Sequence, residues 1–173
     1  MHTPSATETT PILNSARDLY EIVKGDVIAA AEMMPESGYS LKIDPNVRTF
    51  GQQVAHIADT NYWFASSCLD EANPFPGVTP AAAGVLEKTK MTKSEILTAL
   101  RSSFAYCDKA FTSMSDAALV DIVETSPARN RRVNKAFLSN LAFFHTAGPY
   151  GAMTLYLRSQ GIVPPSPRRF SQR

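Results

Sequence analysis

The stretch TKSEILTALRSSFAYCDKAFTSM, residues 92–114, carries the most regular pattern in this sequence. Its apolar residues recur at alternating intervals of three and four positions: Leu97, Leu100, Phe104, Cys107, Phe111 and Met114. That period is one face of an α-helix, and Thr92 with Glu95 forms a capping box that starts the helix. The narrow apolar seam is typical of helices in bundles, so the stretch predicts an all-α fold.

Two helices are predicted before this stretch. The first begins at Thr10-Pro11, with Thr10 as the cap and proline at the first helical position, and it ends at Pro35 and Gly38. The second opens with another capping box, Thr49 with Gln52. Its apolar stripe then runs through Phe50, Val54, Ile57, Ala65 and Cys68.

A fourth helix is predicted from about Lys135 to Gln160, with Gly161 ending it. Its centre, from Leu141 to Leu157, is apolar on nearly every side. A helix of that kind is surrounded by its own bundle or by a partner subunit. The sequence therefore predicts a four-helix bundle with a long connection between the second and third helices.

The connections carry weaker signals. The segment from Asp70 to Met91 is rich in proline and glycine and is interpreted as loop. Residues 115–134 predict a short helix followed by the cluster Arg129-Asn130-Arg131-Arg132, and no strand pattern is expected anywhere. An up-down path is the simplest topology, although the long connections would permit a crossover. We expect the bundle to span residues 11–165, between tails at 1–10 and 166–173.

Bulk properties exclude several classes. Lys+Arg of 17 against Asp+Glu of 16 leaves a formal net charge of +1, which gives no general attraction to nucleic acid or an anionic membrane. The short basic clusters, including Arg168-Arg169, are interpreted as solvated surface. Cys68 and Cys107 lie inside helical patterns without metal-type spacing, so both are expected to be buried structural thiols.

Location is expected to be cytoplasmic. The segment Met1–Thr10 is polar and lacks the apolar centre of a signal peptide. No uninterrupted apolar run reaches the roughly 18–20 residues that a membrane span needs.

His56 and His145 are the candidate functional residues from the sequence itself. His145 shares a helical stripe with Leu138, Ala142, Ala152 and Tyr156, so it is either a hydrogen-bonded core residue or a ligand. His56 falls beside Gln52, Asp59, Thr60 and Trp63 on the helical wheel, away from the apolar stripe. That face is either solvated or the wall of a pocket, and the pattern leaves both interpretations open.

Four segments together resemble the DinB/YfiT-like family. They are VRTFGQQVAHIAD at 47–59, EANPF at 71–75, SFAYCD at 103–108 and YGAMTLYLRSQGIVPP at 150–165. The resemblance covers most of the chain, from the first helix to Pro165. It implies a four-helix bundle, commonly a homodimer, with a cleft for which Asp59, Trp63 and Tyr150 are the candidate lining residues.

The resemblance also implies a divalent metal, Zn²⁺ or Ni²⁺, held by three histidines. One stands on the second helix and two stand on the fourth at i and i+4, a spacing that puts two imidazoles on one face. His56 matches the first of these positions and His145 the second, but the third position holds Pro149. Proline has no donor atom and predicts a kink or break in the turn that carries His145. Asp59, one turn from His56, is the one alternative ligand considered.

Three hypotheses about function follow. The leading one is a bundle with a degenerate metal site, a small-molecule-binding or stress-related protein with weak or no metal-dependent catalysis. The second, implied by characterised members of the family, is a metal-dependent thiol S-transferase or hydrolase using His56 and His145, with a small thiol or electrophile as substrate. The third is a non-catalytic dimeric structural protein.

Overall fold

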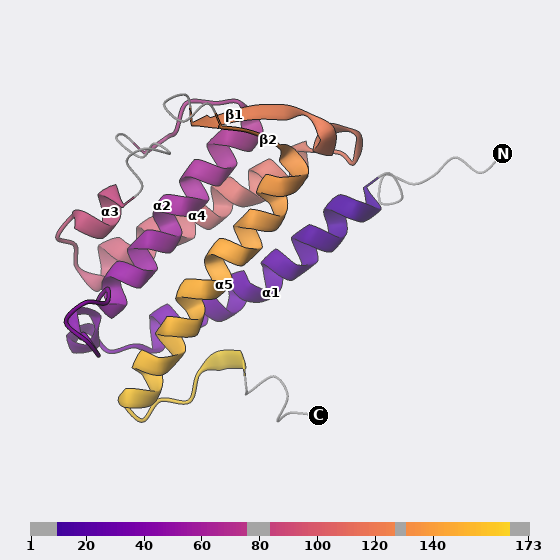
Figure 1. The fold of residues 1–173 in the computed structure, drawn as a ribbon. Helices are drawn as coiled ribbons and strands as arrows, with labels where there is room; N and C mark the ends of the chain where they lie inside the picture. Colours follow the sequence, from indigo (N-terminus) through magenta and orange to yellow (C-terminus); the bar gives the residue numbers. More distant parts are fainter. Residues whose placement is uncertain (1–9, 76–83, 127–130, 167–173) are drawn as a thin grey trace, which may run out of the picture.

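Four long helices form a bundle in the computed structural model, which describes residues 10–75, 84–126 and 131–166 (Figure 1). The helices are α1 (Pro11–Met33), α2 (Phe50–Leu69), α4 (Lys93–Ser113) and α5 (Lys135–Ser159). The predicted all-α four-helix bundle is confirmed. The predicted tails and Arg168-Arg169 lie outside the described residues, except for Thr10 and Ser166 at the edges.

The bundle has a crossover topology. Side-chain contacts join Asn61 of α2 to Ser103 of α4 and, further along both helices, Glu71 after α2 to Lys109 of α4. Both partners of each contact advance in the same direction, so α2 and α4 are parallel. Of the two paths that the sequence left open, the structure has the crossover, since α4 begins at the same end of the bundle as α2 (Figure 1).

Helix starts follow the predicted caps in two of three cases. Both capping boxes, Thr49 with Gln52 and Thr92 with Glu95, are complete. The predicted Thr10 cap is wrong, since its side chain makes no capping hydrogen bond. The carboxylate of Asp116 caps α1 instead, accepting the backbone N–H groups of residues 12 and 13 at 3.0 and 2.9 Å. A distant carboxylate thus satisfies donors that a local hydroxyl was expected to satisfy.

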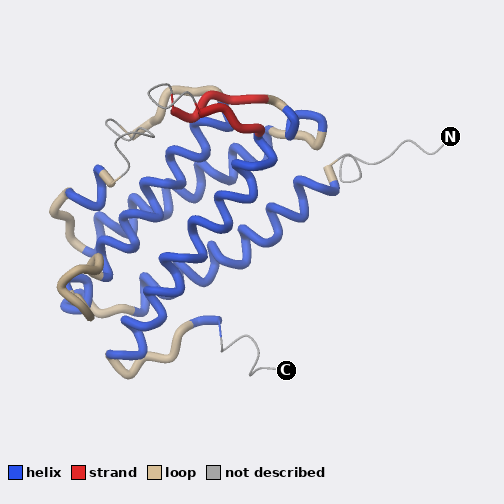
Figure 2. The backbone as a smooth tube through the Cα atoms, in the orientation of Figure 1, coloured by secondary structure: helices blue, strands red, loops and turns tan. Residues whose placement is uncertain are grey.

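Short elements were missed in the connections. A 3₁₀ turn η1 (Glu36–Ser40) follows α1, and the predicted loop before α4 contains a one-turn helix, α3 (Val85–Lys88). The short helix expected after α4 is η2 (Ala117–Val120). It leads into an antiparallel hairpin, β1 (Ile122–Ser126) with β2 (Arg131–Asn134), at one end of the bundle (Figure 2). Strands this short leave too few alternating positions for a period of two to be recognised.

The core confirms the seam of α4. Leu100, Phe104, Cys107, Phe111 and Met114 are all buried, and Leu97 is half-buried against them. Cys68 and Cys107 are buried free thiols, as expected. Burial raises the pKa of Cys68 to about 12 and that of Cys107 further, so neither is a thiolate near neutral pH.

Helix α5 continues through Pro149 without a break. The break expected there is wrong, although the proline still lacks the N–H that would bond to the carbonyl of residue 145. Gly161, at φ +71°, follows the end of the helix, as predicted. Phe144 and Leu155 are 73% and 56% exposed, so the bundle alone does not surround this helix.

Within the described residues, no helix combines the length and hydropathy that a membrane crossing would require.

Candidate functional site

His56 and His145 face each other across the contact between α2 and α5. Their ring centroids lie 5.8 Å apart with the planes inclined at 51°. Both rings line one cavity of about 340 Å³. The rest of its wall comes from Arg48 just before α2, from Gln53 on α2, and from Phe144, Gly148, Pro149 and Ala152 on α5. The two histidines predicted from the sequence are therefore neighbours in space, although 89 positions separate them in the chain.

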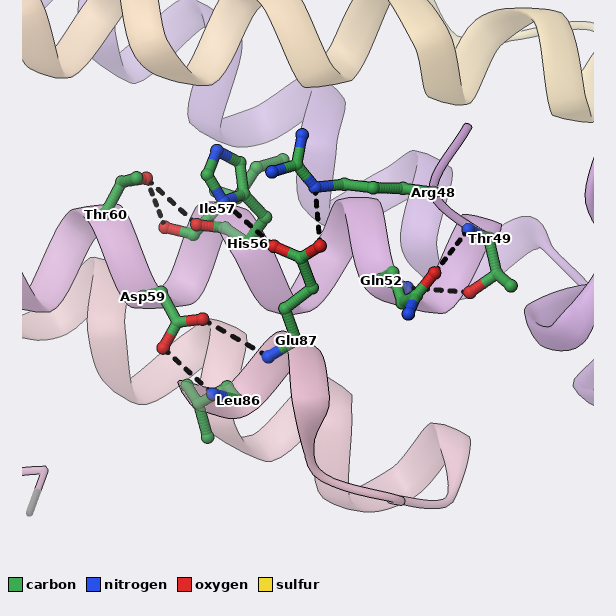
Figure 3. Close-up of polar contacts among 9 residues, drawn as sticks. All are labelled: Arg48, Thr49, Gln52, His56, Ile57, Asp59, Thr60, Leu86 and Glu87. Carbon is green, nitrogen blue, oxygen red and sulfur yellow. Dashed lines mark hydrogen bonds and ion pairs between the residues drawn. The ribbon is translucent and has the colours of Figure 1, made fainter. Parts of the chain in front are cut away.

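Arg48, Glu87 and His56 lie in a row on one side of the cavity, as Figure 3 shows. Nδ1 of His56 lies 3.5 Å from Glu87 Oε2 of α3, beyond good hydrogen-bond geometry. The other carboxylate oxygen of Glu87 accepts a hydrogen bond from Arg48 Nε at 2.8 Å. The second ring nitrogen of His56 points away from Glu87 (Figure 3). Glu87 thus links the guanidinium and the imidazole on one side of the cavity.

Both histidines favour the neutral form. Burial is the main cause that lowers the pKa of His56, the charge of Arg48 lowers it further, and Glu87 opposes the shift. Burial and then Arg48 also lower the pKa of His145. Each ring is therefore a neutral imidazole near pH 7, with one N–H donor and one acceptor nitrogen.

Asp59 stands three positions after His56 on α2, but its side chain does not line the cavity. Its side chain is buried, and its two oxygens accept the backbone N–H groups of Leu86 and Glu87 at 3.1 and 3.2 Å (Figure 3). Burial raises the pKa of Asp59, while these hydrogen bonds oppose the shift. The carboxylate thus caps α3 and fixes the helix that carries Glu87.

Trp63 and Tyr150, the other two candidates for the cleft, also lie outside the cavity wall. Trp63 is half-buried against the hydrophobic core. Tyr150 is buried, and its hydroxyl accepts the N–H of Ser166 at 3.3 Å. Both side chains are part of the packing of the bundle.

The sequence interpretation missed Arg48, Gln53 and Phe144. Gln53 stands three positions before His56, a spacing that puts both on one helical face and could have identified it. Phe144 directly precedes His145. Arg48 carried no periodic signal, since it lies outside α2 and reaches the cavity through its length and its contact with Glu87.

Comparison with known proteins agrees with this architecture. The family model of the DinB superfamily matches residues 19–148, which is most of the bundle. The chain belongs to the DinB superfamily. No curated protein matches the sequence.

Two solved proteins share the fold. A DinB-like protein from Bacillus cereus superposes with a TM-score of 0.71 at 16% identity, covering 88% of this chain and 95% of that one. A mutant of the mycothiol-dependent maleylpyruvate isomerase gives a TM-score of 0.63 at 14% identity, and the unmutated isomerase gives 0.58. The match covers 82% of this chain but only 59% of the isomerase. At these identities the likeness concerns the fold alone.

Of the three-histidine metal site that the resemblance implies, the structure brings two imidazoles, those of His56 and His145, to one cavity. Pro149 stands one turn after His145 and lines the same cavity, but it offers no ligand atom. Asp59 is engaged in capping α3, and Glu87 in its hydrogen bond to Arg48. Among the described residues, no group of three or more His, Cys, Asp or Glu side chains is placed to hold a metal ion. Two imidazoles remain, fewer than a stable Zn²⁺ site uses.

Proposed function

We propose that this chain is a small-molecule-binding member of the DinB superfamily, with a degenerate metal site and weak or no metal-dependent catalysis. Its binding site is the cavity between α2 and α5 that contains His56 and His145. The observation that carries the proposal is the position of Pro149, which lies on the cavity wall where a third ligand is expected. The engagement of Asp59 and Glu87 in other hydrogen bonds supports it.

Restoring the missing donor tests this proposal. Pro149→His would place a third imidazole one turn after His145, and we expect it to bind about one equivalent of Zn²⁺ or Ni²⁺. The wild type, purified without chelator, should retain less than about 0.1 equivalent, because two imidazoles hold these metals weakly. Pro149→Ala is the matched control, since it restores the backbone hydrogen bond without adding a ligand. Elemental analysis and titration with each metal give the stoichiometry.

The alternative enzyme makes the opposite prediction in the same experiment. Stoichiometric metal in the wild type, lost in His145→Ala, would contradict the degenerate site and favour a metal-dependent thiol S-transferase or hydrolase. Assays of small thiols with electrophiles, with and without added metal, would then define the reaction.

We also propose that a second copy of the chain covers the exposed face of α5. Phe137, Phe144 and Leu155 are 41%, 73% and 56% exposed and lie on one side of the helix, at intervals of 7 and 11 residues. A twofold axis beside α5 would bury this stripe against itself, the commonest arrangement in homo-oligomers. Support for a dimer therefore comes from an apolar helical face that the bundle leaves open.

Light scattering at micromolar concentration tests the dimer. Leu155→Asp should convert it to a monomer, because a carboxylate would be buried in the interface. Val120→Asp is the control, since Val120 is also apolar and is 73% exposed but lies in η2. A monomeric wild type would overturn the proposed dimer.

A further inference from the structure

Arg48 is the single charged residue on the wall of the histidine cavity, among the residues that the structure describes. Two contacts fix it: its carbonyl accepts the hydroxyl of Tyr156, and its Nε donates to Glu87. No hydrogen bond within the described chain engages its two terminal nitrogens. The side chain is 41% exposed and extends beside the His56 ring (Figure 3). One edge of the guanidinium is thus held by protein, while its remaining donors have no protein acceptor.

Gln53 adds a polar group that the protein leaves unpaired. It is only 8% exposed, yet no hydrogen bond in the described part of the chain engages its side-chain amide. The amide is not among the side-chain groups that are both fully buried and without a partner, so it keeps contact with the open space of the cavity. Since Gln53 lines the cavity, the missing partner is expected to come from there.

The other groups on the wall define what would fit. The neutral rings of His56 and His145 line the same space, and each carries one N–H donor and one acceptor nitrogen. No carboxylate lines the cavity, because Glu87 stands behind Arg48. Phe144, Pro149 and Ala152 form an apolar side on α5. The cavity therefore combines the guanidinium of Arg48 and the amide of Gln53 with an apolar surface.

We propose that the cavity binds a small organic carboxylate, its two oxygens accepting from Arg48 and Gln53 and its apolar body packing on Phe144 and Pro149. This inference rests on the proposed small-molecule function and names the class of its ligand. A guanidinium matches a carboxylate through two parallel N–H donors, a geometry that ammonium groups do not offer. A volume of about 340 Å³ is at the lower end of known small-molecule pockets, which limits the ligand to a compact acid.

Benzoate is a suitable probe, with benzamide as its neutral analogue and inorganic phosphate as an anion without an apolar body. The ring C–H signals of His56 and His145 in NMR spectra of the full chain report binding at the site. We expect benzoate to shift both signals with saturation in about the millimolar range, and benzamide and phosphate to bind at least roughly tenfold more weakly.

Variants separate recognition by Arg48 from effects on folding. Arg48→Gln should weaken benzoate binding at least about tenfold, and Arg48→Lys by less, because lysine keeps the charge but loses the paired donors. Arg101→Gln is the matched control, since Arg101 also pairs with a carboxylate, Glu32, but lies far from the cavity on α4. It should bind benzoate like the wild type. Thermal unfolding of each variant establishes that it is folded.

Several results would overturn the inference. Benzoate binding at this site is contradicted if neither histidine signal shifts. Recognition by Arg48 is contradicted if Arg48→Gln binds benzoate like the wild type. Equal affinities for benzoate and benzamide would overturn carboxylate recognition while leaving a small-molecule site in place. Failure of the proposed function is distinguished independently, because it depends on the metal content of the wild type and Pro149→His.

Discussion

Helix α2 packs against α4 on one side and against α5 on the other, and we call these two contacts the α2–α4 seam and the α2–α5 seam. The two seams differ in how completely their polar side chains are hydrogen-bonded within the protein. Towards α4, the amide of Asn61 donates to Ser103 Oγ at 3.2 Å, and that hydroxyl donates to the carbonyl of Leu100 at 2.7 Å. The thiol of Cys107 donates to the carbonyl of Asn61 at 3.4 Å. Towards α5, by contrast, Gln53 has no hydrogen bond from its side chain among the described residues, and the two imidazoles border a cavity.

This difference separates packing from recognition in one helix. The three polar groups of the α2–α4 seam, on Asn61, Ser103 and Cys107, stabilise the fold because each has a hydrogen-bond partner. Polar groups in the α2–α5 seam are held in place without being satisfied, which costs stability and is typical of a site that awaits a ligand. Substitutions in the α2–α4 seam should therefore change mainly the free energy of unfolding, and substitutions in the α2–α5 seam mainly the affinity for the ligand.

The largest difference in the free energy of unfolding is expected between two Phe→Ala substitutions, one in the core and one on the exposed side of α5. Phe104→Ala should lower the free energy of unfolding by about 3–5 kcal/mol, because a side chain only 1% exposed leaves a cavity in the core. Phe144→Ala, made in the monomeric Leu155→Asp variant, should change it by less than about 0.5 kcal/mol, since the ring is 73% exposed when no second copy covers it. Urea denaturation followed by circular dichroism measures both. Equal losses would show that the α5 face is as tightly packed as the core.

A gain in stability is expected from Pro149→Ala. Alanine restores the N–H that can bond to the carbonyl of residue 145, and it removes the ring from the helix interior. The gain should be about 1–3 kcal/mol, below the full penalty for proline because α5 is already helical around it. Gly151→Ala, exposed on the same helix with open space at its Cβ, should gain about 1 kcal/mol from propensity alone. Similar gains in the two variants would mean that Pro149 is not strained.

The sequence predicted the α2–α4 side of the bundle better than the α2–α5 side. The α4 helix, its capping box and its buried positions follow from local periodicity, and all are confirmed. The sequence left the choice between an up-down path and a crossover open, because that choice depends on the connection that contains α3. That helix is a single turn, and its cap is the carboxylate of Asp59, 26 positions before Val85.

The site was predictable only where it coincided with helical spacing or a family pattern. His56 and His145 were candidates from the sequence, and the structure places their rings side by side. Arg48 was not a candidate, since its place depends on Glu87 of α3 and on the hydroxyl of Tyr156, two contacts across the fold. The role of Asp59 in capping α3 was not predicted for the same reason. Its carboxylate accepts hydrogen bonds from N–H groups of a helix that the sequence did not reveal.

Acid should weaken the fold through the α2–α5 seam. The pKa values of His56 and His145 are lowered in the folded state, so the unfolded chain binds more protons. Their contribution is complete above the unfolded pKa of about 6.5 and is lost as the pH falls below it. The upper limit is about 1.4 kcal/mol per pH unit for each histidine, and solvent in the cavity should reduce it substantially. Arg48 and Glu87 are the charged groups that act on the His56 ring.

Urea denaturation between about pH 5.5 and 7.5 measures this dependence, a window above the usual titration of carboxylates. The double variant His56→Gln/His145→Gln should show a flatter profile than the wild type. An unchanged profile would mean that other groups account for the loss of stability in acid.

The smallest effect on stability is expected from Gln53→Met, which distinguishes the two seams most directly. Ser103→Ala, its counterpart in the α2–α4 seam, should cost about 1–2 kcal/mol because it leaves the buried amide of Asn61 without an acceptor. Gln53→Met removes no protein hydrogen bond and keeps a similar volume, so the free energy of unfolding should change by less than about 0.5 kcal/mol. Its affinity for benzoate should nevertheless fall several-fold, whereas Ser103→Ala should bind benzoate like the wild type. A large loss of stability in Gln53→Met would show that the amide already has a partner, and the two seams would then not differ as described.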